Sequence, residues 1–136
     1  EAPEEPLHLP EPGDGRLRAV TDLLHHDPAD DRGLAQLGRA VGASERTLSR
    51  LFQAELGMGF RQWRTQLRLH HALVHLAAGD SITRTAAACG WSNPSTFIEA
   101  FSAALGQTPG RYRSGAAPPR HDEVAGPVTG AGGGTR

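Results

Sequence analysis

The chain has 136 residues and a net charge of −1, and all 14 of its basic residues are arginine. This length fits one domain with terminal tails, and no stretch is apolar enough to predict a membrane span. The single cysteine excludes an internal disulfide and a cysteine-based zinc site, which is typical of a reducing compartment, so we expect a cytoplasmic location.

The charge is divided along the sequence. Residues 1–32 carry three arginines against nine acids, whereas residues 33–113 carry nine arginines against four acids, and residues 114–136 are balanced. A basic central segment next to an acidic one favours a protein that binds a polyanion, although this signal is weak when taken alone.

Both ends have the composition of unstructured chain. Residues 1–15 hold four prolines and five acids, and residues 114–136 are rich in glycine, proline and alanine. Neither composition can bury a hydrophobic core. We therefore predict a disordered acidic arm or linker at 1–15, a folded domain at 16–113 and a disordered tail at 114–136.

The first half of the predicted domain reads as three helices. After a cap at Asp14, an apolar stripe ends before the turn-forming sequence HDPADD. A second helix follows in GLAQLGRAVG, and Ser44 caps a third in ERTLSRLFQAEL. The side chains predicted to be buried are Leu17, Val20, Leu23, Leu24, Leu34, Leu37, Val41, Leu48, Leu51, Phe52 and Leu56.

The second half continues with the longest helix, in FRQWRTQLRLHHALVHLAAG. Short helices follow in ITRTAAAC, in the stretch CGWSNPSTFIEAF after a cap at Ser92, and in the closing TPGRYR. The buried side of the long helix is predicted to hold Phe60, Trp63, Leu67, Leu73 or Val74, and Leu76. No segment shows convincing strand alternation, so the predicted fold class is all-α.

Four of these helices form an internal repeat. When LAQLGRAVGASERTLSRLF is set beside ITRTAAACGWSNPSTFIEAF, Gly42 pairs with Gly90 and Ser44 with Ser92. A one-residue insertion then keeps the apolar positions of the second helices in register. Each copy is a short helix, a glycine turn and a capped second helix, which is the helix-turn-helix arrangement. We place the two units at about residues 35–56 and 82–105.

Small residues have a physical role in this repeat. Gly42 and Gly90 supply the left-handed conformation after the first helix that a β-carbon would disfavour. Gly38 and Ala86, within the first helices, allow the second helix to pack closely across the first.

With these motifs the sequence resembles the C-terminal DNA-binding domain of the AraC/XylS family of bacterial transcription regulators. The resemblance covers about residues 16–113, and its most diagnostic part is the ending STFIEAFSAALGQTPGRYR. It implies seven helices in a double helix-turn-helix fold, with the two units joined by a long bridging helix. It also implies that double-stranded DNA is bound in two successive major-groove segments.

The same resemblance carries expectations about partners. It implies transcription activation through contact with RNA polymerase, in the cytoplasm and in association with the nucleoid. Members of the family usually carry an effector-binding or dimerisation domain on the N-terminal side. The acidic, proline-rich start fits a linker from such a domain, which we therefore expect upstream of this chain.

The resemblance places the base-reading residues on the outer sides of the two second helices. Arg50 is the strongest candidate because an exposed arginine can donate two hydrogen bonds to guanine O6 and N7; the alternative is an ion pair with Glu45 or Glu55. The base-reading set is Arg46, Ser49, Arg50, Ser95, Thr96 and Glu99, beside Pro94. The set expected to contact phosphates is Ser44, Arg61, Arg64, Arg84, Asn93 and Arg111, with Arg113 as a further candidate.

Glu99 departs from the family pattern, in which a basic residue is common at this position. A carboxylate near phosphates lowers non-specific affinity for DNA. Glu99 could accept a hydrogen bond from cytosine N4, or the second unit could clamp the backbone through its helix N-terminus while the first unit supplies specificity. The residues leave both interpretations open.

Other polar and aromatic residues are interpreted as structural. Arg68 is expected to tie the bridging helix to a neighbouring unit, and Trp63 and Trp91 to belong to the core. His71 and His75 are one turn apart, but they lack a third ligand nearby, so no metal is expected. Cys89, in a helix of alanines, fits a buried apolar residue.

The sequence leaves three classes of function to compare. The favoured class is a sequence-specific transcription regulator, and the alternative is a protein-interaction module of the same fold with weak or lost DNA binding. An enzyme is disfavoured because no catalytic triad, phosphate-binding loop or paired carboxylates occur in a recognisable arrangement. No cofactor is expected.

Overall fold

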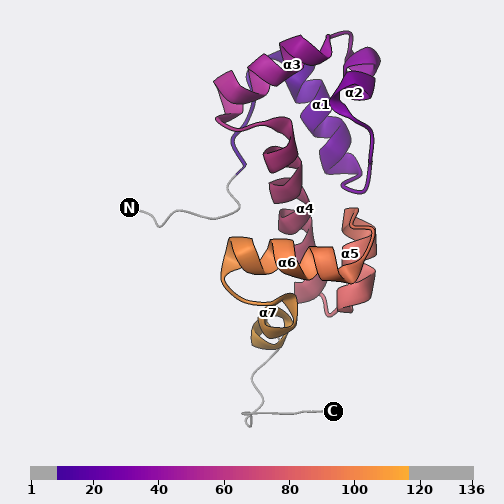
Figure 1. The fold of residues 1–136 in the computed structure, drawn as a ribbon, viewed down its shortest axis with the longest axis vertical. Coiled ribbons are helices and arrows are strands. Elements are labelled where there is room, and N and C mark those ends of the chain that lie inside the picture. The colour runs from indigo at the N-terminus through magenta and orange to yellow at the C-terminus, as the bar shows by residue number, and fades with distance from the viewer. Residues whose placement is uncertain (1–8, 117–136) are drawn as a thin grey trace.

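Two helical units lie at opposite ends of one long helix (Figure 1). The computed structural model of the chain describes residues 9–116, and within that range it contains helices and no strands. The helices are α1 (Gly15–His26), α2 (Leu34–Val41), α3 (Glu45–Leu51), the π-helical segment η1 (Phe52–Leu56), α4 (Phe60–Ala77), α5 (Ile82–Cys89), α6 (Pro94–Leu105) and α7 (Pro109–Ala116). The predicted double helix-turn-helix fold is confirmed.

The folded chain begins before the boundary predicted at residue 16. The backbone N–H groups of Gly13 and Asp14 donate to Glu55 Oε1 at 2.8 and 3.0 Å, and Leu9 packs against the first core. The domain also extends past the predicted end at residue 113, because α7 continues to Ala116. The rest of the predicted arm and tail, residues 1–8 and 117–136, lies outside the described residues.

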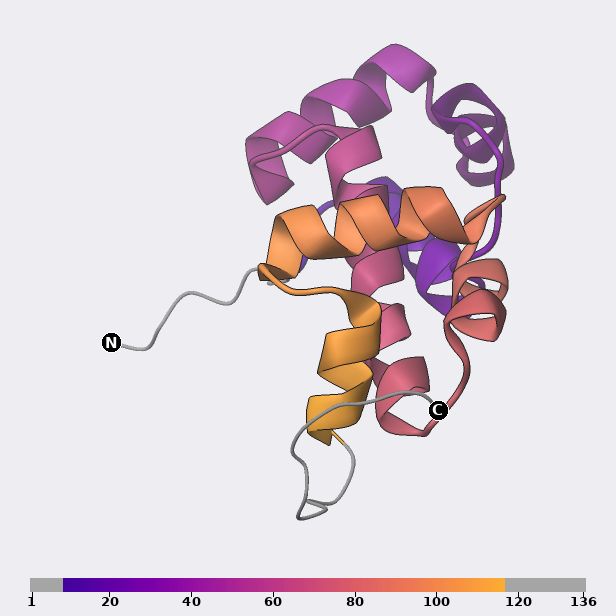
Figure 2. The same ribbon diagram turned by 60° about the horizontal axis from the view of Figure 1, so that its bottom comes forward.

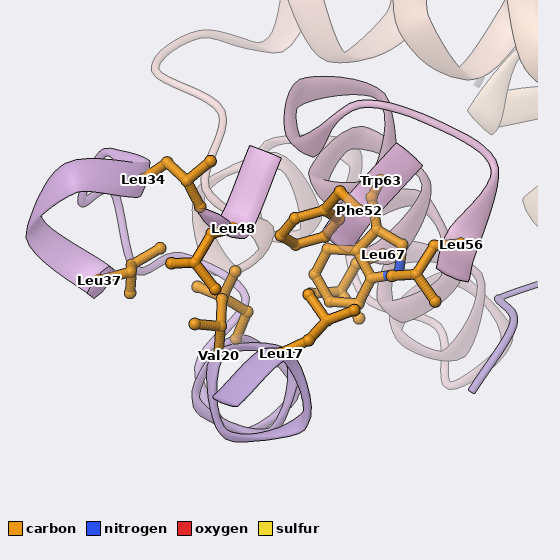
Figure 3. Packing of buried hydrophobic residues seen from close by; sticks show 10 residues of the cluster. Leu17, Val20, Leu34, Leu37, Leu48, Phe52, Leu56, Trp63 and Leu67 are labelled. Atoms are coloured by element: carbon orange, nitrogen blue, oxygen red, sulfur yellow. The ribbon is translucent and has the colours of Figure 1, made fainter. Parts of the chain in front are cut away.

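The first unit consists of α1, α2, α3 and η1 with the first half of α4. Asp14 caps α1 as predicted, because its side chain accepts from the backbone N–H groups of Arg16 and Leu17 at 2.8 and 3.2 Å. The buried side chains of these helices converge on one core (Figure 3), made by Leu17, Val20, Leu24, Leu34, Leu37, Leu48, Phe52, Leu56, Trp63 and Leu67.

The second unit consists of α5, α6 and α7 with the second half of α4. Its core is separate from the first and contains Leu69, Ala72, Leu76, Ala86, Cys89, Phe97 and Phe101. Three aromatic contacts close it: Trp91 to Phe97 at 4.8 Å, Phe97 to Phe101 at 5.8 Å and Phe101 to Tyr112 at 5.8 Å between ring centroids. Helix α7 lies along α4 and completes the unit (Figure 2).

The glycine turns match the repeat. Gly42 and Gly90 end α2 and α5 with φ of +80° and +104°, the left-handed conformation predicted from the sequence. Gly38 is required for a different reason: a β-carbon there would collide with the Ala43 carbonyl and lie 3.3 Å from Leu48 Cδ1. Close packing of α3 across α2 therefore depends on this glycine.

Three details differ from the sequence-based expectation, and one open alternative is resolved. Leu23 is 36% exposed rather than inward. Of the two alternatives predicted for α4, Leu73 packs on the second core and Val74 is 64% exposed. Asn93, and not Ser92, caps α6, since the inserted residue shifts the helix start to Pro94. The predicted third helix changes to π-helical bonding at Phe52; it ends at Leu56, and Gly57 follows in the left-handed conformation.

No helix in residues 9–116 has the length and apolar character needed to cross a lipid bilayer.

Candidate DNA-binding surface

The second helices of the two units, α3 and α6, run in the same general direction in both views (Figures 1 and 2). Each begins at its unit's glycine turn, after α2 or α5, so both N-termini lie on the same side of α4. Helix α4 has 18 residues and is therefore about 27 Å long. Helix α4 therefore separates the N-termini of α3 and α6.

Helix α3 presents a polar outer face. Ser44 caps it by accepting from the Thr47 backbone N–H at 3.1 Å, while its own hydroxyl donates to Thr47 Oγ1 at 3.0 Å. Leu48 points into the core and is fully buried, so the opposite side faces solvent. That side carries the predicted base-reading residues Arg46, Ser49 and Arg50, all exposed.

Arg50 has an open environment. Glu55, one of the two carboxylates that could have paired with it, instead accepts from the backbone N–H groups of Gly13 and Asp14. The guanidinium makes no ion pair with any group in the described range. Its five N–H donors are therefore available to an external acceptor.

Helix α6 starts with Asn93, whose side chain accepts from the Thr96 backbone N–H at 2.9 Å. Pro94 occupies the first turn, where its missing N–H costs nothing. Ser95 and Glu99 are exposed on the outer face. Thr96 is also exposed, but its hydroxyl donates to Asn93 Oδ1 at 3.1 Å, so its oxygen contributes to the cap.

The predicted phosphate-contacting arginines fall into two groups. Arg61, Arg84 and Arg111 are exposed. Arg64 is partly buried, donates to the Arg32 carbonyl and places its Cζ 4.5 Å from the centre of the Phe60 ring. Burial and the nearby Arg68 lower the pKa of Arg64. Because Arg64 is committed to the α1–α2 loop, we correct the prediction and leave it out of the candidate surface.

Arg113 also has a structural partner, since its guanidinium donates to the Gly79 carbonyl at 2.8 Å. It secures α7 to the turn after α4. Arg61, Arg84 and Arg111 have no ion pair within residues 9–116, so their guanidinium groups are open.

The acids of the α1–α2 loop are satisfied inside the protein. Arg32 Nη2 lies 2.7 Å from Asp30 Oδ2, and this guanidinium holds the pKa of Asp30 below its usual range. Neither this pair nor the contact of Glu55 with the N-terminal segment was visible in the sequence pattern. An Asp-x-Arg spacing in a turn was the available signal for the first, and no local signal marks the second.

The residues interpreted as structural lie where they were predicted. Trp63 is buried, and Trp91 packs against the second core. Cys89 is buried, and desolvation raises the pKa of its thiol to about 11, so it stays protonated at neutral pH. His75 Nδ1 lies 2.8 Å from Asp80 Oδ2, and no three metal-ligating side chains within residues 9–116 are arranged to hold an ion.

The comparisons with known proteins agree with this geometry. The profile of a helix-turn-helix domain family matches residues 37–115. The chain is 39% identical over 110 residues to the HTH-type transcriptional regulator NimR of Escherichia coli, covering 81% of this chain and 40% of NimR. It is 34% identical over 106 residues to the regulator RipA of Corynebacterium glutamicum, covering 78% of this chain and 32% of RipA. The chain thus spans well under half of these curated relatives.

Solved structures show the same fold. A transcriptional regulator of Chromobacterium violaceum, described as an AraC-type DNA-binding domain protein, matches 77% of this chain and 95% of its own, with a TM-score of 0.71 and 27% identity. The DNA-binding domain of AdpA, solved in complex with a target DNA, matches 75% of this chain and 93% of its own, with a TM-score of 0.70 and 25% identity. The repeat, the bridging helix and these matches lead to one conclusion: the chain belongs to the helix-turn-helix family of AraC-type DNA-binding domains.

Proposed function

We propose that this domain gives a transcription regulator its sequence-specific contact with DNA, by placing α3 and α6 in two successive major-groove segments on one face of the duplex. One observation carries the proposal: two capped helices, running the same way and held apart by α4, expose their outer faces together. An α-helix fits the major groove, and adjacent major-groove segments lie about 34 Å apart.

The first unit is proposed to supply most of the base recognition. Arg46 and Arg50 stand on the exposed side of α3, and Arg50 has no ion partner in the described range to release before it binds. A bidentate contact of arginine with guanine O6 and N7 is the commonest specific contact in the major groove. Ser49 lies between them on the same face.

The second unit is proposed to add contacts to the DNA backbone and a weaker recognition of bases. The N-terminus of α6 offers backbone N–H groups and the positive end of the helix dipole to a phosphate. Ser95 and Glu99 are exposed on this helix, whereas Thr96 shares its hydroxyl with the cap. Arg84 and Arg111, on α5 and α7, are proposed to contact phosphates beside it, as Arg61 is beside the first unit.

For the whole protein, we propose a bacterial activator that works at the nucleoid through contact with RNA polymerase. An effector-binding or dimerisation domain is proposed on the N-terminal side. Two facts support this extension: the family to which the domain belongs, and the length of NimR and RipA, of which this chain spans 40% and 32%.

A binding selection tests the DNA-reading proposal. The domain is incubated at low salt with a pool of random duplexes, and bound duplexes are amplified and sequenced over several rounds. We expect enrichment of one asymmetric site that extends over two helical turns. Selection of no sequence would overturn the proposal and would favour the alternative, a protein-interaction module of the same fold.

A further inference from the structure

The two hydrophobic cores meet at a single point of the bridging helix. Leu67 is the last α4 residue in the first core, and Leu69 is the first α4 residue in the second. Arg68 stands between them. The two cores share no residue, so α4 is the one element in residues 9–116 that contributes apolar side chains to both.

Arg68 adds a polar link from α4 to both units at once. Its guanidinium donates from Nε to the Pro28 carbonyl at 2.8 Å and from Nη2 to the Asp30 carbonyl at 3.0 Å. Both carbonyls belong to the α1–α2 loop of the first unit. From Nη1 it donates to the Gly90 carbonyl at 3.1 Å, in the turn of the second unit.

The geometry of this group is restrictive. A guanidinium is planar and offers its N–H donors in a fixed fork, so carbonyls bound on three of its atoms hold fixed positions relative to one another. Only 11% of the Arg68 side chain is exposed, and Asp31 Oδ1 lies 3.5 Å from Nη2. A lysine could keep the charge but could not bind the same three carbonyls.

The turn of the second unit is shaped around this side chain. A β-carbon at Gly90 would lie 2.6 Å from Arg68 Cζ and 2.7 Å from Nε. At Gly42, the equivalent turn of the first unit, a β-carbon would meet nothing within 4 Å. Both glycines have positive φ, and Gly90 in addition makes room for the guanidinium.

We propose that Arg68 is a positioning residue that fixes the relative orientation of the two helix-turn-helix units and thereby sets the half-site spacing that the domain accepts. The part concerning DNA spacing rests on the proposed function; the part concerning orientation does not. Without the guanidinium, the units would lose these three hydrogen bonds and depend more on the stiffness of α4, and DNA would have to select one orientation from a broader set.

Orientation can be measured without DNA. In a Cys89→Ala background, cysteines introduced at the exposed positions Ala54 and Ala103 carry spin labels, and pulsed dipolar spectroscopy records their distance distribution. We expect a narrow distribution for the parent, and a broader or shifted one after Arg68→Gln or Arg68→Lys. Arg64→Gln is the matched control, because Arg64 holds the same loop but has no hydrogen bond to the second unit.

A second pair of variants keeps the test decisive if Arg68→Gln fails to fold. Gly90→Ala and Gly42→Ala both place a β-carbon at positive φ, but only at Gly90 would that β-carbon collide with the guanidinium. We expect a broadened distribution for Gly90→Ala and not for Gly42→Ala. Unchanged distributions in folded Arg68 and Gly90 variants would overturn the proposal.

The DNA measurement uses the site enriched by selection, together with duplexes that carry one half-site alone. Arg68→Lys is expected to lower affinity for the two-half-site duplex about tenfold, while one-half-site affinity changes little. Its preference for one spacer length is expected to weaken. Equal losses of affinity for the two duplexes would contradict a positioning role. If the distance distributions broaden in a domain that selects no DNA sequence, the proposed DNA function is refuted and the role of Arg68 in orientation is retained.

Discussion

At the scale of single residues, α3 and α6 have different outer faces. The first exposes two arginines and a serine, and the second exposes two hydroxyl residues and the carboxylate of Glu99. Contacts to the phosphate backbone dominate affinity for DNA, and contacts to base edges dominate specificity. The two helices are therefore expected to contribute unequally to affinity and to specificity.

Arg50→Ala tests the principal base contact. We expect a loss of about 1–3 kcal/mol in binding to the selected site and relaxed preference at one base pair, because a bidentate contact is removed. Competition binding on site variants measures both quantities. Arg16→Ala, which removes the same charge from α1, is the control. A uniform loss across all sequences would show that Arg50 contacts a phosphate instead.

Glu99 is tested by two substitutions. Glu99→Arg is expected to raise affinity for any duplex and to steepen the dependence on salt, because a phosphate contact adds about one counterion to the release. Glu99→Gln keeps the shape and removes the charge. If it also alters preference at one position, Glu99 reads a base; a salt slope that Glu99→Arg leaves unchanged would show that the side chain faces away from DNA.

At the scale of elements, the helix-turn-helix units depend on short-range chemistry. Caps at Asp14 and Ser44 and left-handed glycines at Gly42 and Gly90 lie within four residues of the groups that they serve. For this reason the helix boundaries could be predicted from the sequence. The N-cap of α6 could not be predicted in this way. Asn93 and Ser92 can each accept a hydrogen bond from the backbone N–H groups of the first turn, and the inserted residue decides between them.

Gly38→Ala tests the packing of α3 on α2. The added β-carbon would meet the Ala43 carbonyl and Leu48, so we expect a loss of about 1–3 kcal/mol in the free energy of unfolding. Denaturant unfolding followed by circular dichroism measures it. Gly110→Ala in α7, where a β-carbon meets nothing within 4 Å, should be neutral or stabilising. Equal effects of the two changes would show that α2 and α3 have room to adjust.

At the scale of the whole molecule, the contacts that orient the units join residues far apart in sequence. Arg68 reaches Pro28 across 40 residues, and Gly13 reaches Glu55 across 42. The local sequence pattern predicts that Arg68 has a structural role, but it does not predict which carbonyls Arg68 binds. The same limit explains why the sequence pattern predicts a phosphate contact for Arg64 and a fold that starts at residue 16 rather than 9.

The histidines give the molecule a pH-dependent stability. Burial, with His25, His70 and His75 nearby, lowers the pKa of His71, and its Nε2 is buried without a hydrogen-bond partner in residues 9–116. Above the ordinary pKa of 6.5, His71 is neutral in both states and the stability is fully present. As the pH falls below this value the unfolded chain gains the proton first, so stability decreases until the folded pKa is passed.

We therefore expect the free energy of unfolding to fall between pH 7.5 and 5.5, and to fall less in His71→Leu. Urea unfolding at the two pH values measures the difference. His26→Gln, at an exposed position of α1, is the control. A loss in His71→Leu as large as in the parent would assign the pH dependence to other groups.

The central claim, that α3 and α6 read two successive major-groove segments on one face, is tested most directly by the phase of the two half-sites. About 5 base pairs inserted between them turn the second half-site to the opposite face of the duplex. Affinities are measured for the selected site, for the inserted site and for each half-site alone. We expect the inserted site to bind no better than a single half-site. Equal affinity for the selected and inserted sites would contradict the account.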